Sequence, residues 1–366
     1  MPESLPEYLV VFKEEFQDFL NQCESLDGHA RLGLSTKQGF YKMGQPREFG
    51  GEDASLLKMV IAWESMAVAG MSSDGTILGP QPGVLGRATG MLREEYLLPF
   101  LNGEKFGSFA FTESDRSSPT KATSSKNVFK INGNKSYVSG LEKSDFISVL
   151  ADVSCCDGGD KCGPTLFVVD KGSNGVIIEE LFTSIDGSNH GRVNFVDVEV
   201  PKQNIVGGIG KGIPAAIDRI LRERLEQAAV ASGMAIRATK LLEIHLSEMN
   251  GDGKRMGDIE GIRLRYADMR IKTYAIRSVL YRTSAMIDDC DDAINEITMA
   301  KVFCTETASE VIDWALQIFG GRSLIEGHPL EEMYRRIRSM RLAGGASDVL
   351  RLNVSRGVFD FQSGIL

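Results

Sequence analysis

Cysteine and histidine are scarce in this 366-residue chain, which has six cysteines and four histidines. The histidines stand apart, without the spacing of metal ligands. Three cysteines gather in SCCDGGDKCGP (154–164), but a zinc site would need paired CxxC-like motifs or nearby histidines. We therefore predict no metal site, and a hairpin tip that carries free thiols at Cys155, Cys156 and Cys162.

The chain also lacks basic runs and long apolar runs. Its net charge is −9, with no interleaving of basic and aromatic residues, so nucleic acid is not an expected partner. No window of about 18 uninterrupted apolar residues exists, which argues against a membrane span. MPESLPEYLVVFKEEF at the N-terminus does not resemble a secretory signal. These features predict a cytoplasmic protein.

Three regions differ in their hydrophobic period. The chain exceeds the usual size of a single core, so two or three packed units are expected. Residues 1–105 show helical spacing, as in EYLVVFKEEFQDFLNQC (7–23) and DASLLKMVIAWESMAVAGM (53–71). Residues 106–205 show period two, and residues 206–366 return to long helical patterns. We predict an α+β fold with an N-terminal all-α domain, a central β-domain and a C-terminal helical bundle.

Local signals refine the last two domains. NVFKINGNKSYVSG (127–140) contains Asn132-Gly133 between β-rich flanks, which predicts a hairpin. The other strands have no helix-length crossover between them, so an antiparallel sheet is expected. Three long helices with short breaks, one of them at NGDGKRMGD (250–258), predict an antiparallel bundle. VLRLNVSRGVFDF (349–361), with the segment before it, can supply a fourth helix.

Several motifs resemble those of one family in a single order along the chain. FAFTESDRSSP (109–119) is similar to the FALTEPGAGSD motif of the acyl-CoA dehydrogenase family, and KSYVSG (135–140) resembles its K-x-W-I-T-N strand. GFYKMGQPREFGG (39–51), DIEGIRLRYADM (258–269) and QIFGGR (317–322) also match family segments. The resemblance implies the family's fold, FAD as cofactor, and α,β-dehydrogenation of an acyl thioester.

The resemblance also implies which residues hold FAD. Thr112 would hydrogen-bond the flavin ring, and Ser118 would lie near the pyrophosphate and pantetheine. Tyr137 replaces the tryptophan that covers the ring, and Ser139 replaces the threonine whose hydroxyl reaches N5. Ordinary core packing is the alternative for Tyr137 and for Phe109, which opens the first motif. The family segment that holds the adenine half of a neighbouring subunit's flavin matches Gln317, Gly320 and Gly321, so at least a homodimer, or a homotetramer, is expected.

The catalytic base is expected on the helical stretch ILRERLEQAAVASGMAI (220–236). Most family members carry the base as glutamate in Y-E-G-T-S-E, but RLAGGASDVLR (341–351) places Gly344 there, followed by Gly345. A minority, including isovaleryl-CoA and prolyl-carrier-protein dehydrogenases, places a glutamate before a bundle arginine, here Glu223-Arg224. We predict that Glu223 is the base, with Arg224, Gly344, Gly345 and Ser118 near the substrate. The small residues after Glu223 would make room for an acyl-pantetheine chain.

A surface glutamate paired with Arg219 or Arg222 is the alternative for Glu223. Some flavin-phosphate positions depart from the family pattern: Met249 stands for an arginine, Glu260 for a glutamine and Ala346 for a threonine. Such departures imply weakened flavin binding, or a non-catalytic paralogue.

The substrate carrier and the electron acceptor follow only from the resemblance. KSYVSG and the Glu-Arg pair look closest to dehydrogenases of natural-product pathways, whose acyl group is tethered to an acyl carrier protein. A free short or branched acyl-CoA is the alternative. KRMG (254–257) and MYRRIRSMRLA (333–343) are candidate basic patches for such a carrier. The acceptor would be an electron-transfer flavoprotein or oxygen.

Overall fold

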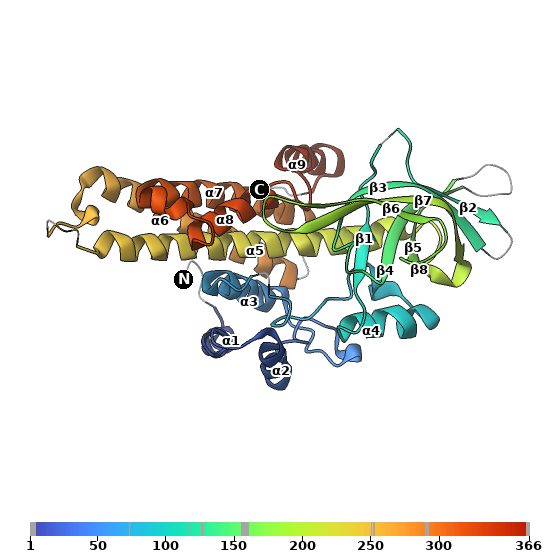
Figure 1. Ribbon diagram of the computed structural model, residues 1–366, viewed down its shortest axis with the longest axis horizontal. Helices are drawn as coiled ribbons and strands as arrows, with labels where there is room; N and C mark the ends of the chain where they lie inside the picture. The colour runs from blue at the N-terminus through green and yellow to red at the C-terminus, as the bar shows by residue number, and fades with distance from the viewer. Residues whose placement is uncertain are drawn as a thin grey trace. The chain divides into compact units, whose positions relative to one another are not determined.

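The computed structural model (Figure 1) describes residues 5–72, 74–115, 117–125, 128–154, 161–249, 251, 253–289 and 293–363. The chain forms two compact units. The helical unit comprises Met1–Gly44, Asp53–Leu78 and Leu221–Leu366, and the sheet unit comprises Gln45–Glu52 and Gly79–Ile220. The domain limits at residues 105 and 205 stay a prediction.

The helical unit contains the long helices that the sequence indicates. Its elements are α1 (Glu7–Cys23), α2 (Gly28–Gln38), α3 (Leu56–Ala69), α5 (Gly212–Ser247, which begins in the sheet unit), α6 (Glu260–Asp288), α7 (Ile294–Phe319), α8 (Pro329–Met340) and α9 (Ser347–Phe361). The predicted helix 7–23 coincides with α1, and NGDGKRMGD separates α5 from α6. Hydrogen bonds join α5 to α6 through Thr239 and Thr273 at 3.3 Å, and α5 to α7 through Arg224 and Thr298 at 3.1 Å.

Helix α2 was not predicted from the sequence. Its apolar pattern is weak, but its ends carry clear signals. The Asp27 side chain accepts a hydrogen bond from the backbone N–H of Ala30 at 2.9 Å, which satisfies one free donor of the first turn. Gly39 ends the helix in the left-handed conformation, with φ +83°.

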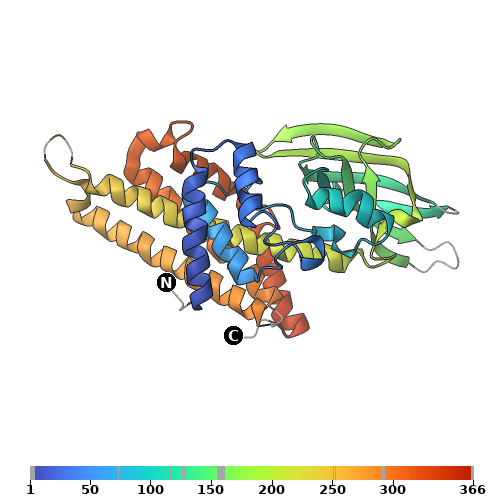
Figure 2. The ribbon, with the colours of Figure 1, turned by 90° about the horizontal axis from the view of Figure 1, so that it is seen from below.

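Among its described residues, the sheet unit has eight strands: β1 (Gly107–Ala110), β2 (Lys121–Ser125), β3 (Val128–Ser139), β4 (Phe146–Ser154), β5 (Lys161–Asp170), β6 (Val176–Thr183), β7 (Asn189–Pro201) and β8 (Ile205–Val206). The strand order is β6-β7-β3-β2-β4-β5-β8, and β1 pairs with β4. Helix α4 (Leu98–Leu101) and the turn before it lie against β4 (Figure 2), where Tyr96 and Phe100 meet the ring of Phe146 at 5.3 and 6.2 Å.

Two expectations for the sheet need correction. Asn132-Gly133 does not turn a hairpin, because β3 runs continuously through it, with a register shift against β7 between Ile131 and Gly133. A Cβ at Gly133 would lie 2.5 Å from the Thr120 Cα, so the glycine serves a close backbone approach at a bulge. The sheet is also not purely antiparallel, since β1 and β2 each pair with β4 in parallel.

The small-residue stretch of α5 has another role than the predicted one. A Cβ at Gly233 would lie 2.3 Å from the Glu64 carbonyl oxygen and 2.5 Å from the Ala67 Cβ, so the backbone of α3 fills this space. Ala231 and Ser232 are fully buried there. The expected room for an acyl-pantetheine chain along this stretch is therefore occupied by helix packing.

The helical core also contains a buried charged network. Glu64 is 2% exposed and accepts hydrogen bonds from Ser232 at 2.6 Å, Tyr281 at 2.8 Å and Arg277 Nε at 3.1 Å. Burial, reinforced by the Glu64 charge, raises the pKa of the Tyr281 phenol above its ordinary range. The network joins α3, α5 and α6 and satisfies the buried carboxylate.

The β4–β5 connection tests the cysteine prediction. Strands β4 and β5 pair antiparallel, as a hairpin requires. Cys162 is disulfide-bonded, so the expected free thiol is wrong at this position, whereas Cys155 and Cys156 lie outside the described residues. Across the described residues, no helix has the length and apolar character to cross a membrane, and no group of three or more His, Cys, Asp or Glu side chains is arranged to hold a metal ion.

Candidate active site

The turn after β1 is held in place by a buried ion pair. Lys135 of β3 is fully buried, and its ammonium donates to Glu113 Oε1 at 2.5 Å and to the Phe111 carbonyl at 3.1 Å. Burial lowers the pKa of Lys135, and the Glu113 carboxylate opposes this shift. Thr120 donates to the other Glu113 oxygen at 2.8 Å. Thr112, next to this carboxylate, is left exposed at the surface of the sheet unit.

Tyr137 is presented on the surface by a strained backbone. Its φ is +54°, which is unfavourable for a bulky residue and is typical of functional positions. The side chain is 69% exposed, and its ring meets Phe182 edge-on at 5.7 Å. The core alternative for Tyr137 is therefore wrong. Ser139, two residues further along β3, is also exposed.

The donor set of this surface fits a flavin. Hydroxyl groups at Thr112, Ser118 and Ser139 can hydrogen-bond ring and phosphate atoms, and the Tyr137 ring offers an apolar plane. Ser118 is exposed in a turn, where its N–H donates to the Asp115 carbonyl at 3.2 Å. Phe109 is half-buried, with Phe111 at 5.6 Å and the Arg219 guanidinium 4.7 Å above its ring.

The helical unit presents the predicted base on α5. Glu223 is half-buried and accepts a hydrogen bond from Gln227 Nε2 at 3.2 Å, one helical turn further on. Gln227 Oε1 is buried and has no hydrogen-bond partner among the described residues. Its lone pairs can therefore accept a hydrogen bond from water or from a ligand.

Arg224 fixes the loop that follows α8. Its Nε donates to the Gly344 carbonyl at 3.0 Å, and its Nη1 donates to Thr298 of α7 at 3.1 Å. Burial lowers the pKa of Arg224, and the neighbouring Glu223 charge opposes the shift. The guanidinium therefore anchors α5 to the loop and to α7.

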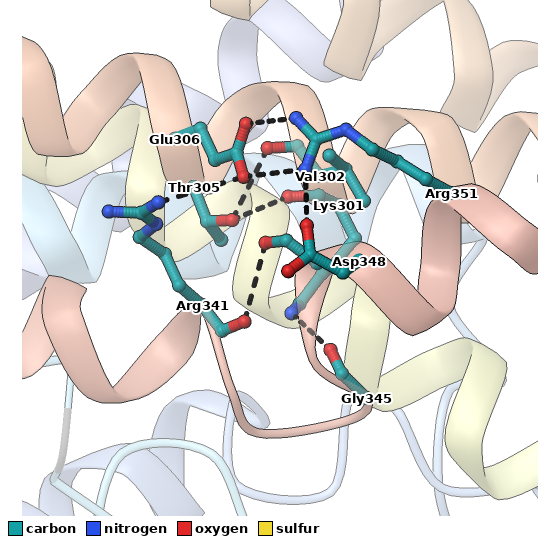
Figure 3. A network of polar contacts seen from close by, with 9 residues as sticks. Lys301, Val302, Thr305, Glu306, Arg341, Gly345, Asp348 and Arg351 are labelled. Atoms are coloured by element: carbon teal, nitrogen blue, oxygen red, sulfur yellow. Dashed lines mark hydrogen bonds and ion pairs between the residues drawn. The ribbon is translucent and has the colours of Figure 1, made fainter.

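Lys301 binds the next carbonyl of the same loop. The residue is fully buried on α7, and its Nζ donates to the Gly345 carbonyl at 2.9 Å (Figure 3). Burial, together with the positive charge of Arg224, lowers the pKa of Lys301 to about 8. Two cations thus bind two consecutive carbonyl oxygens.

An ion-pair cluster closes the outer side of this loop (Figure 3). Glu306 of α7 pairs with Arg351 of α9, 3.0 Å from its Nη1, and with Arg341 at 3.8 Å. Asp348 lies 3.5 Å from Arg351. The hydrogen bonds from Arg351 hold the pKa of Glu306 below its usual range. The loop between α8 and α9 is therefore fixed from both sides.

The two positions at which the family resemblance would place the base, 223 and 344, lie near one another in this unit. Gly344 has φ +63°, and a Cβ placed on it would lie 3.2 Å from Gln227 Nε2 and 3.3 Å from Gln227 Oε1. Gln227 is also the residue that hydrogen-bonds Glu223. A side chain at position 344 would thus point toward the group that Glu223 already contacts.

The other predicted cofactor residues lie elsewhere. Gln317, Gly320 and Gly321 are exposed at the C-terminal end of α7, roughly 28 Å along the helix from Thr298 at ~1.5 Å per residue. The helical unit does not bring them together with Glu223. Met249, which stands where the family pattern has an arginine, is 71% exposed, and Glu260, which stands where the pattern has a glutamine, is also exposed. Neither side chain is therefore withdrawn from the protein surface.

Sequence reasoning missed three residues of these sites. Gln227 was visible as the i+4 neighbour of Glu223, but nothing in the sequence indicated the approach of Gly344. Lys301 carried no signal, because its role comes from a contact 44 residues away. His190, which hydrogen-bonds Ser139 at 3.1 Å, is 51 residues away from its partner.

Solved structures define the fold first. A probable acyl-CoA dehydrogenase from Mycobacterium abscessus superposes with a TM-score of 0.84 at 22% identity, covering 96% of this chain and 99% of that one. The acyl-CoA dehydrogenase from Geobacillus kaustophilus gives 0.83 at 22% identity, covering 98% and 99%. The predicted fold class is confirmed.

Sequence relatives define the family. The C-terminal domain of acyl-CoA dehydrogenases matches residues 210–359. The 3-(aryl)acrylate reductase of Clostridium sporogenes is 29% identical, covering 87% of each chain. The acryloyl-CoA reductase (NADH) of Anaerotignum propionicum is also 29% identical, and the similarity covers 95% of this chain and 89% of the reductase. Residues 210–359 therefore belong to the acyl-CoA dehydrogenase family, whose members depend on FAD, and the rest of the chain is similar to members of that family.

Proposed function

We propose that this chain is an FAD-dependent oxidoreductase that acts on the Cα–Cβ bond of an acyl-CoA thioester, with Glu223 as the base. One observation carries the assignment of the base. Glu223 accepts a hydrogen bond from Gln227, and a side chain at Gly344, the usual glutamate position, would start next to the same Gln227 amide. A carboxylate on α5 can therefore replace one on the loop. Catalysis requires reach to the α-carbon rather than a fixed position in the sequence.

Glu223 would remove the α-proton of the thioester. FAD, when bound, supplies the partner for hydride exchange at the β-carbon. Relatives named as reductases support a reaction that also runs in the opposite sense, in which protonated Glu223 returns its proton to the α-carbon. Arg224 and Lys301 would keep the 344–345 loop rigid, so that the carboxylate and the substrate hold one geometry.

The cofactor residues remain those that the family motifs assign. In our proposal Phe109, Thr112, Ser118, Tyr137 and Ser139 contact FAD. The exposed side chain and the φ of +54° at Tyr137 support this assignment, because backbone strain of this kind is concentrated at functional positions. The C-terminal end of α7 would supply a second contact through Gln317, Gly320 and Gly321.

The thioester carrier is the finer part of the proposal. The relatives' names indicate coenzyme A, whereas the KSYVSG strand and the Glu-Arg pair favour a carrier protein of a biosynthetic pathway. The expected basic patch of α8 is weak, because Arg336 donates to the Ser72 carbonyl, Arg335 pairs with Glu331 and Arg341 pairs with Glu306. We therefore place acyl-CoA first and the carrier-protein thioester second.

Reconstitution with FAD tests the function. The purified protein is expected to take up FAD, and its visible absorbance is expected to bleach anaerobically on addition of an acyl-CoA. Acyl-CoA and acyl-carrier-protein substrates presented in parallel distinguish the two carriers by their bleaching rates. A protein that takes up no added FAD would be the non-catalytic paralogue and would refute the proposal.

Two protein partners follow from the same proposal. A relative named as a caffeyl-CoA reductase–Etf complex subunit, 29% identical, supports an electron-transfer flavoprotein as redox partner, with oxygen as the alternative. Self-association into a homodimer or homotetramer is supported by exposed apolar side chains on α9, where Leu352, Phe359 and Phe361 are 59%, 83% and 76% exposed. Sedimentation of wild type and Phe359→Ser tests it, since a dissociated variant is expected.

A further inference from the structure

Beside the proposed flavin contact Ser139, the sheet unit carries a chain of hydrogen bonds that the family motifs do not assign. His190 of β7 lies directly opposite Ser139 of β3 and Phe182 of β6 in the strand register. Its Nδ1 lies 3.1 Å from the Ser139 hydroxyl, and its Nε2 lies 2.9 Å from the Ser188 hydroxyl. Ser188 in turn donates to the Asp186 carboxylate at 2.6 Å.

The number of protons available fixes the donor and the acceptor of each hydrogen bond between Asp186 and Ser139. A carboxylate only accepts hydrogen bonds, so the single proton of the Ser188 hydroxyl points to Asp186. Ser188 must then accept from the Nε2–H of His190, and when the ring is neutral this leaves its Nδ1 without a proton. The Ser139 hydroxyl therefore donates its proton to Nδ1, and its free lone pairs remain for another donor.

The surroundings hold the histidine ring in this position. The ring stacks on Phe182 with centroids 5.9 Å apart and planes inclined by 29°. The Ser188 backbone N–H also donates to Asp186, at 3.1 Å, so the turn before β7 is closed on the carboxylate. Ser139 therefore faces a fixed acceptor rather than a freely rotating side chain.

We propose that His190, oriented by Ser188 and Asp186, is a positioning residue that makes the Ser139 hydroxyl a hydrogen-bond acceptor toward the flavin. The inference rests on the proposed FAD site and adds a residue that sets the reduction potential of the bound FAD. Flavin N5 is an acceptor when oxidised and a donor when reduced, so an accepting Ser139 favours the reduced form. Removing His190 frees the Ser139 proton for N5 and reverses this preference.

The reduction potential of FAD bound to the full chain tests this role. His190→Val removes the acceptor and is expected to lower the two-electron potential by about 30 mV, which corresponds to a tenfold change in the equilibrium constant. His190→Asn keeps an acceptor near the position of Nδ1 and is expected to stay close to wild type. Ser188→Ala releases the ring orientation and is expected to shift the potential in the same direction as His190→Val, but less.

A double-mutant cycle with Ser139→Ala separates positioning from a general change of the strand. In the Ser139→Ala background, His190→Val is expected to leave the potential unchanged, because the hydroxyl it controls is gone. Equal potentials in wild type and His190→Val, or a shift that persists without the Ser139 hydroxyl, would overturn the role of His190 alone. A wild-type protein that takes up no FAD would overturn the proposed function and this inference together.

Discussion

The Glu223→Gln substitution should separate chemistry from folding in this chain. The new amide keeps an oxygen that can accept the hydrogen bond from Gln227 Nε2, now 3.2 Å long. The substitution preserves side-chain volume at a half-buried helical position, so the free energy of unfolding should change by less than about 0.5 kcal/mol. An amide cannot take a proton, and the loss of a general base lowers a rate by roughly 10²- to 10⁴-fold.

The assay is anaerobic stopped-flow reduction of bound FAD by an acyl-CoA, with the FAD content of each preparation measured beforehand. Glu226→Gln, on the exposed side of the same helix, serves as the matched control and should reduce at the wild-type rate. Equal FAD content with a rate for Glu223→Gln within threefold of the control, roughly 0.7 kcal/mol, would refute Glu223 as the base. The loop around Asp348 would then be the next place to examine.

Three further predictions concern the loop and the helical core. Gly344→Ala should lower the free energy of unfolding by about 1–2 kcal/mol, because an alanine is strained at φ +63°; Gly261→Ala, with open space around it, should not destabilise in the same urea titration. Arg277→Met should cost about 3–5 kcal/mol by leaving a buried carboxylate without its cation, whereas Arg263→Met removes an exposed ion pair and should leave the stability nearly unchanged. Similar melting shifts in both variants would contradict this reasoning. Lys301 has its pKa lowered from 10.5 to about 8, so below pH 8 the charged buried ammonium costs stability, and this cost is relieved between about pH 8 and 10.5. The stability of wild type relative to Lys301→Met should therefore rise by about 3 kcal/mol across that window in chemical denaturation, and a flat difference would count against it.

Local patterns in the sequence predicted most elements but not all of their connections. The helix at 7–23 was readable because its apolar residues repeat at helical spacing. The Asn132-Gly133 prediction failed because a short-range turn signal was outweighed by strand pairing, in which β7 continues along β3 on both sides of the bulge. The parallel pairs with β4 depend on contacts between distant segments, which no window of sequence contains.

For the candidate site, too, the sequence accounts for some features and the tertiary structure for others. The sequence by itself determined that Glu223 precedes Arg224, that glycine stands at position 344, where the family resemblance would place the usual acid, and that an aromatic residue and a hydroxyl stand at Tyr137 and Ser139. These are statements about residue type, and they need only the order of the motifs.

Only the tertiary structure decided what these residues contact. It brought Gly344 to Gln227 beside Glu223, gave the Gly345 carbonyl to Lys301, and placed His190 opposite Ser139. It also showed that α3, rather than a ligand, packs against the small residues after Glu223. Such contacts join residues 44 or more positions apart, as for Lys301 with Gly345, and helix packing and strand register rather than local propensity create them.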